Sequence, residues 1–310
     1  MTLLKTRNGA PISRLTFGTM QFGGAADAVE SADMFDAAQG AGINHFDTAL
    51  IYTGGAAEKI LGERIKPVRD DIYLATKVAY EGGASAANIT KGFDTCRKQL
   101  NEDAVDLLYL HRFDDETPLE ETFSTLAEMQ SNGLIRHIGV SNYAAWQIMK
   151  AQAIAKTFGT RIDAIQPMYS LVKRQAEVEI FGVAADQDIA VMPYSPLGGG
   201  LLTGKYADGD TGRLTTDARY RARYGQDWMH ETARQLNDMA RAKGVAAATL
   251  AVAWAAAHPV GPRPIISARS VAQMAPSLAA ADYDLSADEY AAISALSITP
   301  APATDRLEEA

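Results

Sequence analysis

The chain has 310 residues, of which 47% are hydrophobic and 22% are charged, and its formal net charge is −9 at pH 7. This length suits one α/β barrel, for which about 250 residues is typical, and the composition argues against long disordered segments. The net negative charge disfavours a nucleic-acid or membrane-surface partner, because both are anionic. The single cysteine, Cys96, excludes an intrachain disulfide. Since no apolar run is long enough for a signal peptide or a membrane span, we expect a cytoplasmic protein.

The first segment of the chain carries a hairpin signal. Asn8-Gly9 lies between the short stretches 3–5 and 12–13 and predicts a small antiparallel ribbon outside the core. Beyond it, strands alternate with helices. The segments that we interpret as strands are 15–19, 43–47, 72–77, 105–111, 135–140, 162–166, 189–194 and 264–266.

Helical stripes occupy the intervals between these strands. The apolar faces are Met34, Phe35, Ala38 and Ala41; then Ile89, Phe93, Cys96 and Leu100; then Leu119, Phe123 and Leu126. Further helices are expected from Ala56, over 176–186, 231–243 and 271–280, and after Ser286. The longest connection, 195–226, is typical of a lid or a binding loop, with a mobile surface excursion as the alternative.

The alternation predicts a fold of the α/β class. Eight strands alternate with helices, and no linker or shift in composition divides the chain. We therefore expect residues 1–310 to form one domain, an eight-stranded parallel (β/α) TIM barrel with an N-terminal β-hairpin and an extra C-terminal helix. No G-x-G-x-x-G follows the first strand, which argues against a Rossmann half.

Ionisable side chains of four chemical types stand at the ends of consecutive predicted strands. Asp47, Lys77 and His111 end three of them, and Tyr52 follows Asp47 in a loop. In a barrel these strand ends share one rim, which is where barrel enzymes place their catalytic groups. Each residue alone would be interpreted as a solvated strand end or a salt-bridge partner. The four together favour a catalytic site.

This set suits a general acid that acts on a carbonyl. Tyrosine has an unperturbed pKa of about 10, so donation of its proton near neutral pH requires a cationic neighbour, which Lys77 supplies. One charge at about 4 Å is worth up to roughly 4 kcal/mol at an effective dielectric of 20, or around three pKa units. Asp47 would keep Lys77 protonated and offset part of that effect, and neutral His111 would orient the carbonyl oxygen.

Reduction of a carbonyl would also require a bound hydride donor, since no residue of the set supplies electrons. The polar residues at later strand ends suit a nicotinamide. Ser141, Asn142 and Gln166 are able to hold a carboxamide, and Tyr194 is able to stack on a ring. Each of them also has an ordinary interpretation as a turn residue or a helix cap.

A series of motifs resembles the aldo-keto reductase superfamily over nearly the whole chain. In chain order they are FDTALIYTGGAAE, LATK, LLYLHRFD, IGVSN, IQPMYS, YSPLGGGLLTGKY and IISARS. The resemblance implies NADPH bound without a Rossmann domain and hydride transfer to an aldehyde or ketone. It makes Tyr52 the proton donor of a tetrad with Asp47, Lys77 and His111.

The resemblance also implies where the cofactor lies. It assigns Ser141, Asn142 and Gln166 to the carboxamide, Tyr194 to the nicotinamide ring, Ser195, Leu197 and Gly199 to the pyrophosphate, and Arg269 and Gln273 to the adenosine phosphate. Arg269 favours NADPH over NADH, because a guanidinium suits a ribose phosphate. Two departures bear on cofactor affinity more than on catalysis. Ser267, also a predicted cofactor contact, replaces a frequent glycine, and Ser277 replaces a usual asparagine.

Two other functions remain open. Potassium-channel β subunits resemble this family, so the chain could be a nucleotide-binding regulatory subunit with little turnover. A lyase or isomerase could instead use Lys77 as a Schiff base, although Asp47 favours the charged amine.

We expect no metal site. His45 and Asp47 point to the same side of their strand and could form a pair of metal ligands, but the histidines His137, His230 and His258 lie away from the predicted rim. Gly199 to Lys205 has P-loop spacing, but Tyr206 stands where a magnesium ligand is needed. The expected partner is a small carbonyl compound of unspecified identity, and a monomer is the default.

Overall fold

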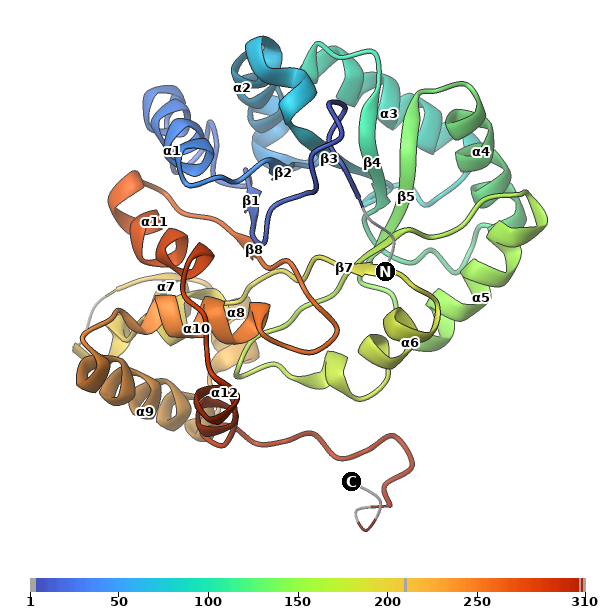
Figure 1. Ribbon diagram of the computed structural model, residues 1–310. Coiled ribbons are helices and arrows are strands. Elements are labelled where there is room, and N and C mark those ends of the chain that lie inside the picture. Colours follow the sequence, from blue (N-terminus) through green and yellow to red (C-terminus); the bar gives the residue numbers. More distant parts are fainter. Residues whose placement is uncertain (1–3, 209–210, 307, 309–310) are drawn as a thin grey trace.

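Eight parallel strands form the centre of the protein, and helices surround them (Figure 1). The structure is a computed structural model and describes residues 4–208, 211–306 and 308. The strands are β1 (Thr16–Gly18), β2 (His45–Asp47), β3 (Tyr73–Val78), β4 (Val105–Leu110), β5 (Ile135–Ser141), β6 (Ala164–Gln166), β7 (Ala190–Val191) and β8 (Ile265–Ile266). Each of them overlaps a predicted strand.

The strands follow the order β7-β6-β5-β4-β3-β2-β1-β8. The two ends of this sheet meet, because Tyr194, just after β7, forms a parallel bridge with Ile265 of β8. The Ile265 amide donates to the Pro193 carbonyl at 2.8 Å. The predicted eight-stranded barrel is therefore confirmed, with short strands at the place where it closes.

The helices cover the outside of the barrel. They are α1 (Ala28–Gly40), α2 (Ala56–Ile65), α3 (Ala86–Leu100), α4 (Leu119–Ser131), α5 (Ala145–Thr157), α6 (Ile180–Asp186), α7 (Arg213–Thr216), α8 (Ala218–Tyr224), α9 (Asp227–Lys243), α10 (Ala247–Ala256), α11 (Val271–Leu278) and α12 (Ala287–Ser294). The predicted extra C-terminal helix corresponds to α12. No helix in the described part of the chain is long and apolar enough to cross a membrane.

Two helical predictions need correction, and two helices were missed. Ala41 does not belong to the buried stripe of α1: it caps the C-terminal end of the helix and is exposed, whereas Met34, Phe35 and Ala38 are buried. The segment 176–186 begins as a 3-10 turn and becomes α-helical only from Ile180. Helices α5 and α10 were not predicted. Nearly all of α10 is buried, so it lacks the polar face from which an amphipathic helix is recognised.

The inside of the barrel is filled by alternate residues of the strands. Tyr73 and Ala75 from β3 and Leu107 and Tyr109 from β4 belong to one buried cluster. A Cβ atom at Gly139 on β5 would lie 2.4 Å from the Tyr109 ring, so only glycine leaves room for this tyrosine. The second, larger cluster lies between the strands and the helices.

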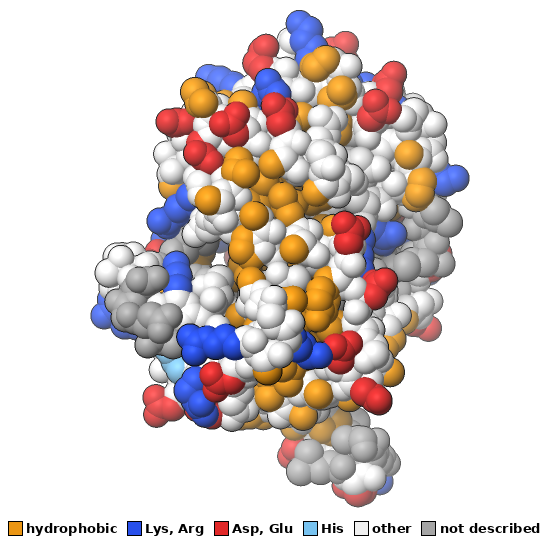
Figure 2. Space-filling model, turned by 60° about the vertical axis from the view of Figure 1, so that its left-hand side comes forward, with side chains coloured by type: hydrophobic (Ala, Val, Ile, Leu, Met, Phe, Trp, Pro, Cys, Tyr) orange, Lys and Arg blue, Asp and Glu red, His pale blue; other side chains and the backbone are white. Residues whose placement is uncertain are grey.

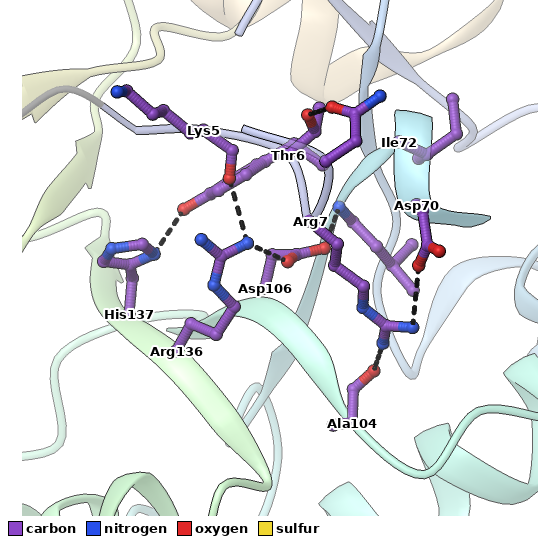
Figure 3. Close-up of polar contacts among 12 residues, drawn as sticks. Lys5, Thr6, Arg7, Asp70, Ile72, Ala104, Asp106, Arg136 and His137 are labelled. Atoms are coloured by element: carbon purple, nitrogen blue, oxygen red, sulfur yellow. Dashed lines mark hydrogen bonds and ion pairs between the residues drawn. The ribbon is translucent and has the colours of Figure 1, made fainter. Parts of the chain in front are cut away.

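The predicted N-terminal ribbon is short and covers the end of the barrel where the strands begin. Its described part is an antiparallel bridge between Lys5 and Pro11, and residues 1–3 lie outside the described residues. Arg136 donates to the Lys5 carbonyl at 2.9 Å and to Asp106 at 2.7 Å, and Arg7 donates to the Ala104 carbonyl at 3.0 Å (Figure 3). The opposite end of the barrel, where the strands finish, is left for a site.

The long connection between β7 and α9 carries helical structure of its own. It contains the turn Gly198–Thr203 and the helices α7 and α8. On the face of the molecule drawn in the space-filling view, basic side chains lie beside a band of apolar side chains (Figure 2). The connection is thus a folded element that brings side chains to the rim.

Candidate active site

Lys77 is the hub of the predicted tetrad. Its ammonium donates to the carboxylate of Asp47, to the Thr48 carbonyl at 2.8 Å and to the Tyr52 hydroxyl at 3.3 Å. An ammonium has three protons, so these bonds use its full donor capacity. Asp47 ends β2, Lys77 lies one residue before the end of β3, and His111 follows β4. The structure brings all four predicted residues to one rim.

The loop after β2 sets the position of Tyr52. Thr53, Gly54 and Gly55 follow it with left-handed φ angles of 49°, 63° and 90°, which turn the chain sharply before α2. The Thr53 hydroxyl donates to the Phe22 carbonyl at 2.7 Å and accepts from the Ala57 amide at 3.0 Å. Thr53 therefore anchors the turn to the loop after β1 and caps the first turn of α2.

Burial controls the protonation of Tyr52. It raises the pKa of the hydroxyl, and the charge of Lys77 offsets only part of that rise. The expectation that the charge of Lys77 lowers the pKa of Tyr52 is confirmed for that contribution, but burial is larger and the net shift is upward. A raised pKa keeps the hydroxyl protonated at neutral pH but makes it a weaker acid, so the opposing charge of Lys77 is the contribution that favours proton donation.

The Lys77–Asp47 pair is fully enclosed, with Lys77 unexposed and Asp47 2% exposed. Burial opposes the charge on Lys77, but Asp47 and Tyr52 outweigh it, and the pKa of Lys77 is raised. Burial raises the pKa of Asp47, and the Lys77 charge and its hydrogen bonds offset this in part. Lys77 therefore stays an ammonium, which is not a nucleophile, and this disfavours the Schiff-base interpretation.

His111 is neutral in this setting. Burial, helped by the charges of Lys77 and Arg112, lowers the pKa of His111 to about 3. Its ring meets the Tyr52 ring edge-on, with 6.1 Å between centroids, and the Tyr80 ring at 4.9 Å. Its buried Nδ1 has no hydrogen-bond partner among the described residues. A neutral imidazole beside Tyr52 is able to hydrogen-bond a carbonyl oxygen.

The residues predicted to hold a carboxamide form one network at the ends of β5, β6 and β7. Ser141 donates to the Gln166 carbonyl at 2.9 Å, and Tyr194 donates to the Asn142 side chain at 2.7 Å. The Gln166 amide donates to Asp47 at 2.9 Å, which ties this network to the tetrad. Asn142, exposed and with a left-handed φ of 58°, presents its side chain at the rim.

The residues predicted at the phosphates lie on two later loops. Ser195, Leu197 and Gly199 lie on the connection after β7, and a Cβ atom at Gly199 would be 2.7 Å from the Tyr220 ring. Ser267 and Arg269 are exposed just after β8.

The Gln273 side chain is occupied within this second loop, because it accepts from the Arg269 amide at 2.8 Å. Arg269 lies two residues before the start of α11, and the N-terminus of a helix favours an anion.

Sequence reasoning missed several groups around the tetrad. The Thr48 carbonyl binds Lys77, the Tyr109 ring lies 6.0 Å from the Lys77 ammonium, and Tyr220 on α8 contributes to the raised pKa of Tyr52. Tyr109 precedes His111 by two residues, so strand alternation was a signal that could have found it.

Tyr224, the last residue of α8, is completely buried. The single cysteine, Cys96, is buried as predicted. Within the described part of the chain, no group of three or more histidine, cysteine or acidic residues is placed to hold a metal ion.

Comparisons with known proteins agree with this geometry. Residues 14–298 match the Aldo/keto reductase family. An uncharacterized oxidoreductase of Bacillus subtilis, YrpG, is 33% identical over 90% of this chain and 90% of its own. A probable voltage-gated potassium channel subunit beta from rice is 32% identical over 82% of each chain.

A solved structure, the glycerol dehydrogenase of Gluconobacter oxydans, superposes with a TM-score of 0.82 at 26% identity, covering 96% of this chain and 95% of that one. The barrel and the family match therefore agree over nearly the same residues. The chain belongs to the aldo/keto reductase family and is an oxidoreductase.

Proposed function

We propose that this enzyme reduces an aldehyde or ketone to an alcohol with NADPH, and that Tyr52 is the general acid. The observation that carries the proposal is the contact between Tyr52 and Lys77, because a buried ammonium holds a protonated phenol beside a neutral histidine. We also propose that residues 1–310 act as one domain, in the cytoplasm and as a monomer, on a small carbonyl compound and without a metal, nucleic-acid or membrane partner.

The rim residues fit a nicotinamide cofactor. Ser141, Asn142 and Gln166 would hold its carboxamide, and the ring of Tyr194, fixed by its bond to Asn142, would support the nicotinamide. The exposed Arg269 would bind the adenosine phosphate, with the remaining predicted contacts around it. When bound, the reduced cofactor supplies the hydride that the protein lacks.

The protein's own residues would handle the proton. The carbonyl oxygen would accept hydrogen bonds from Tyr52 and His111, and it would take the Tyr52 proton as negative charge develops on it. Lys77 stabilises the phenolate that remains, since its ammonium already donates to that oxygen. Asp47 keeps Lys77 charged, and solvent then returns a proton to Tyr52.

The test follows NADPH consumption with 4-nitrobenzaldehyde for the wild type, Tyr52→Phe and Tyr283→Phe. Tyr52→Phe keeps the ring and removes the donated proton, so turnover should fall by about 10²–10⁴-fold while NADPH affinity stays the same. Tyr283 lies between α11 and α12, away from the rim, and its variant should behave as the wild type. Normal turnover in Tyr52→Phe would refute the proposed acid.

A regulatory subunit is the second candidate, because a relative at 32% identity is named a probable potassium channel subunit beta. In that case the protein would bind NADPH tightly, turn over slowly with every aldehyde, and be retained by a partner protein. Binding without turnover in both the wild type and Tyr52→Phe would favour this function over the reductase.

A further inference from the structure

An arginine stands beside the tetrad with its charge uncompensated by any recorded ion pair. Arg112 follows His111 and is exposed, and its guanidinium lies 5.2 Å from the centroid of the Tyr80 ring. Within the described residues this stacking is its recorded contact, and no carboxylate lies at ion-pair distance. The charge is nevertheless close enough to contribute to the lowered pKa of His111.

Three rings place this charge relative to a carbonyl. The His111 ring contacts both the Tyr52 ring and the Tyr80 ring, with centroid distances of 6.1 Å and 4.9 Å. A carbonyl oxygen held by Tyr52 and His111 leaves the rest of the molecule to extend past Tyr80, which is 40% exposed. Arg112 stacks on that same ring, so its guanidinium is within reach of a molecule that extends past Tyr80.

Two neighbouring carboxylates, those of Asp114 and Asp217, are occupied by other partners. Asp114 accepts from Thr117 at 2.6 Å and from the Ala84 amide at 2.7 Å, and Asp217 pairs with Arg219 at 3.1 Å. The guanidinium of Arg112 therefore remains available for an external anion. The residues assigned to the cofactor lie on β5 to β8 and α11, whereas Arg112 and Tyr80 follow β4 and β3.

We infer that the substrate of the proposed reductase carries a carboxylate beyond its carbonyl group and that Arg112 binds this carboxylate. The inference rests on the proposed function and specifies its substrate class. A guanidinium offers paired donors that match a carboxylate, and one unpaired guanidinium balances one negative charge. On a chain with net charge −9, such a local cation is also what an anionic substrate needs to approach the rim.

The test compares two aldehydes of similar shape, 4-carboxybenzaldehyde and its neutral methyl ester, in the wild type, Arg112→Gln and Arg112→Lys. The ratio of kcat/KM for the acid to that for the ester should fall about tenfold in Arg112→Gln, through KM, and recover in part in Arg112→Lys. Added salt should lower the wild-type ratio. Arg221→Gln, on the exposed side of α8, is the matched control and should keep it.

The outcomes separate the two proposals. An unchanged acid-to-ester ratio in Arg112→Gln, with both aldehydes still reduced, would overturn the carboxylate site and leave the reductase standing. If the wild type reduced neither aldehyde, the proposed function would fail. The affinity for 4-carboxybenzaldehyde, measured by quenching of tryptophan fluorescence, would then test the carboxylate site at Arg112. Equal affinity in the wild type and Arg112→Gln would overturn that site.

Discussion

Two buried histidines should make the stability of the protein fall as the pH drops below neutrality. The pKa of His45, inside the barrel, and that of His111, at the rim, are each lowered to about 3, mainly by burial and further by nearby cations. In the unfolded chain a histidine takes up its proton near pH 6.5. The folded state does not bind that proton until the pH is near 3. The contribution of the two histidines to the free energy of unfolding is therefore complete above pH 6.5 and is lost as the pH falls toward 3.

The size of the effect follows from the unfolded chain. At pH 5.5, about one unit below the unfolded pKa, each histidine removes about 1.4 kcal/mol from the free energy of unfolding. His45 and His111 together remove about 3 kcal/mol, a large part of the roughly 5–15 kcal/mol of an ordinary domain. Both folded pKa values lie well below pH 5.5, so their exact positions do not change this figure.

Urea unfolding at pH 7.5 and 5.5 measures the loss. His45→Asn should reduce the loss by about 1.4 kcal/mol, because asparagine takes up no proton in this range. His230→Asn, on the exposed surface of α9, should retain all of it. A wild-type loss below about 1 kcal/mol would refute the reasoning. So would an undiminished loss in His45→Asn, since His45 has no exposed surface through which to titrate.

Three further predictions concern packing and the site. Gly62→Ala would place a Cβ atom 2.1 Å from the last carbonyl oxygen of α3, so urea unfolding should show a loss of about 1–3 kcal/mol in the free energy of unfolding. The control is Gly182→Ala, whose Cβ atom would meet nothing within 4 Å. This variant should stabilise α6 by about 0.5–1 kcal/mol. Thr76→Val removes the donor to buried Glu58, now at 2.5 Å, and should cost about 1–3 kcal/mol in the same assay; an unchanged midpoint would contradict this. Lys77→Met should lower kcat by about 10²–10⁴-fold with NADPH affinity retained, and wild-type turnover would count against its role.

Much of the fold was predictable because strands and strand ends leave local signals. The alternation of apolar residues identified all eight strands, and a polar residue ending each of several strands marked the rim. Asp47, Lys77 and His111 meet because parallel strands in register bring their carboxyl ends together, so the site was predictable once the barrel was. Helix α10 escaped prediction because burial along nearly its whole length removes the periodic signal.

The chemical state of the site was less accessible from the sequence. The sequence indicated that Lys77 stands near Tyr52, but the sign of the pKa shift depends on how completely the loop after β2 and helix α8 enclose the hydroxyl. In the structure burial outweighs the charge. The anchoring of Thr53 on Phe22 likewise joins two loops that are far apart in the sequence.

The sequence by itself determined the class of fold, the rim and the four residue types that meet there, because these depend on periods and strand ends that local side chains encode. Only the tertiary structure decided that burial raises the pKa of Tyr52 and lowers that of His111, and that Arg112 stands over Tyr80 without an ion-pair partner among the described residues. Burial and through-space neighbours arise from loops that pack without any period, so they exist only once the chain has folded.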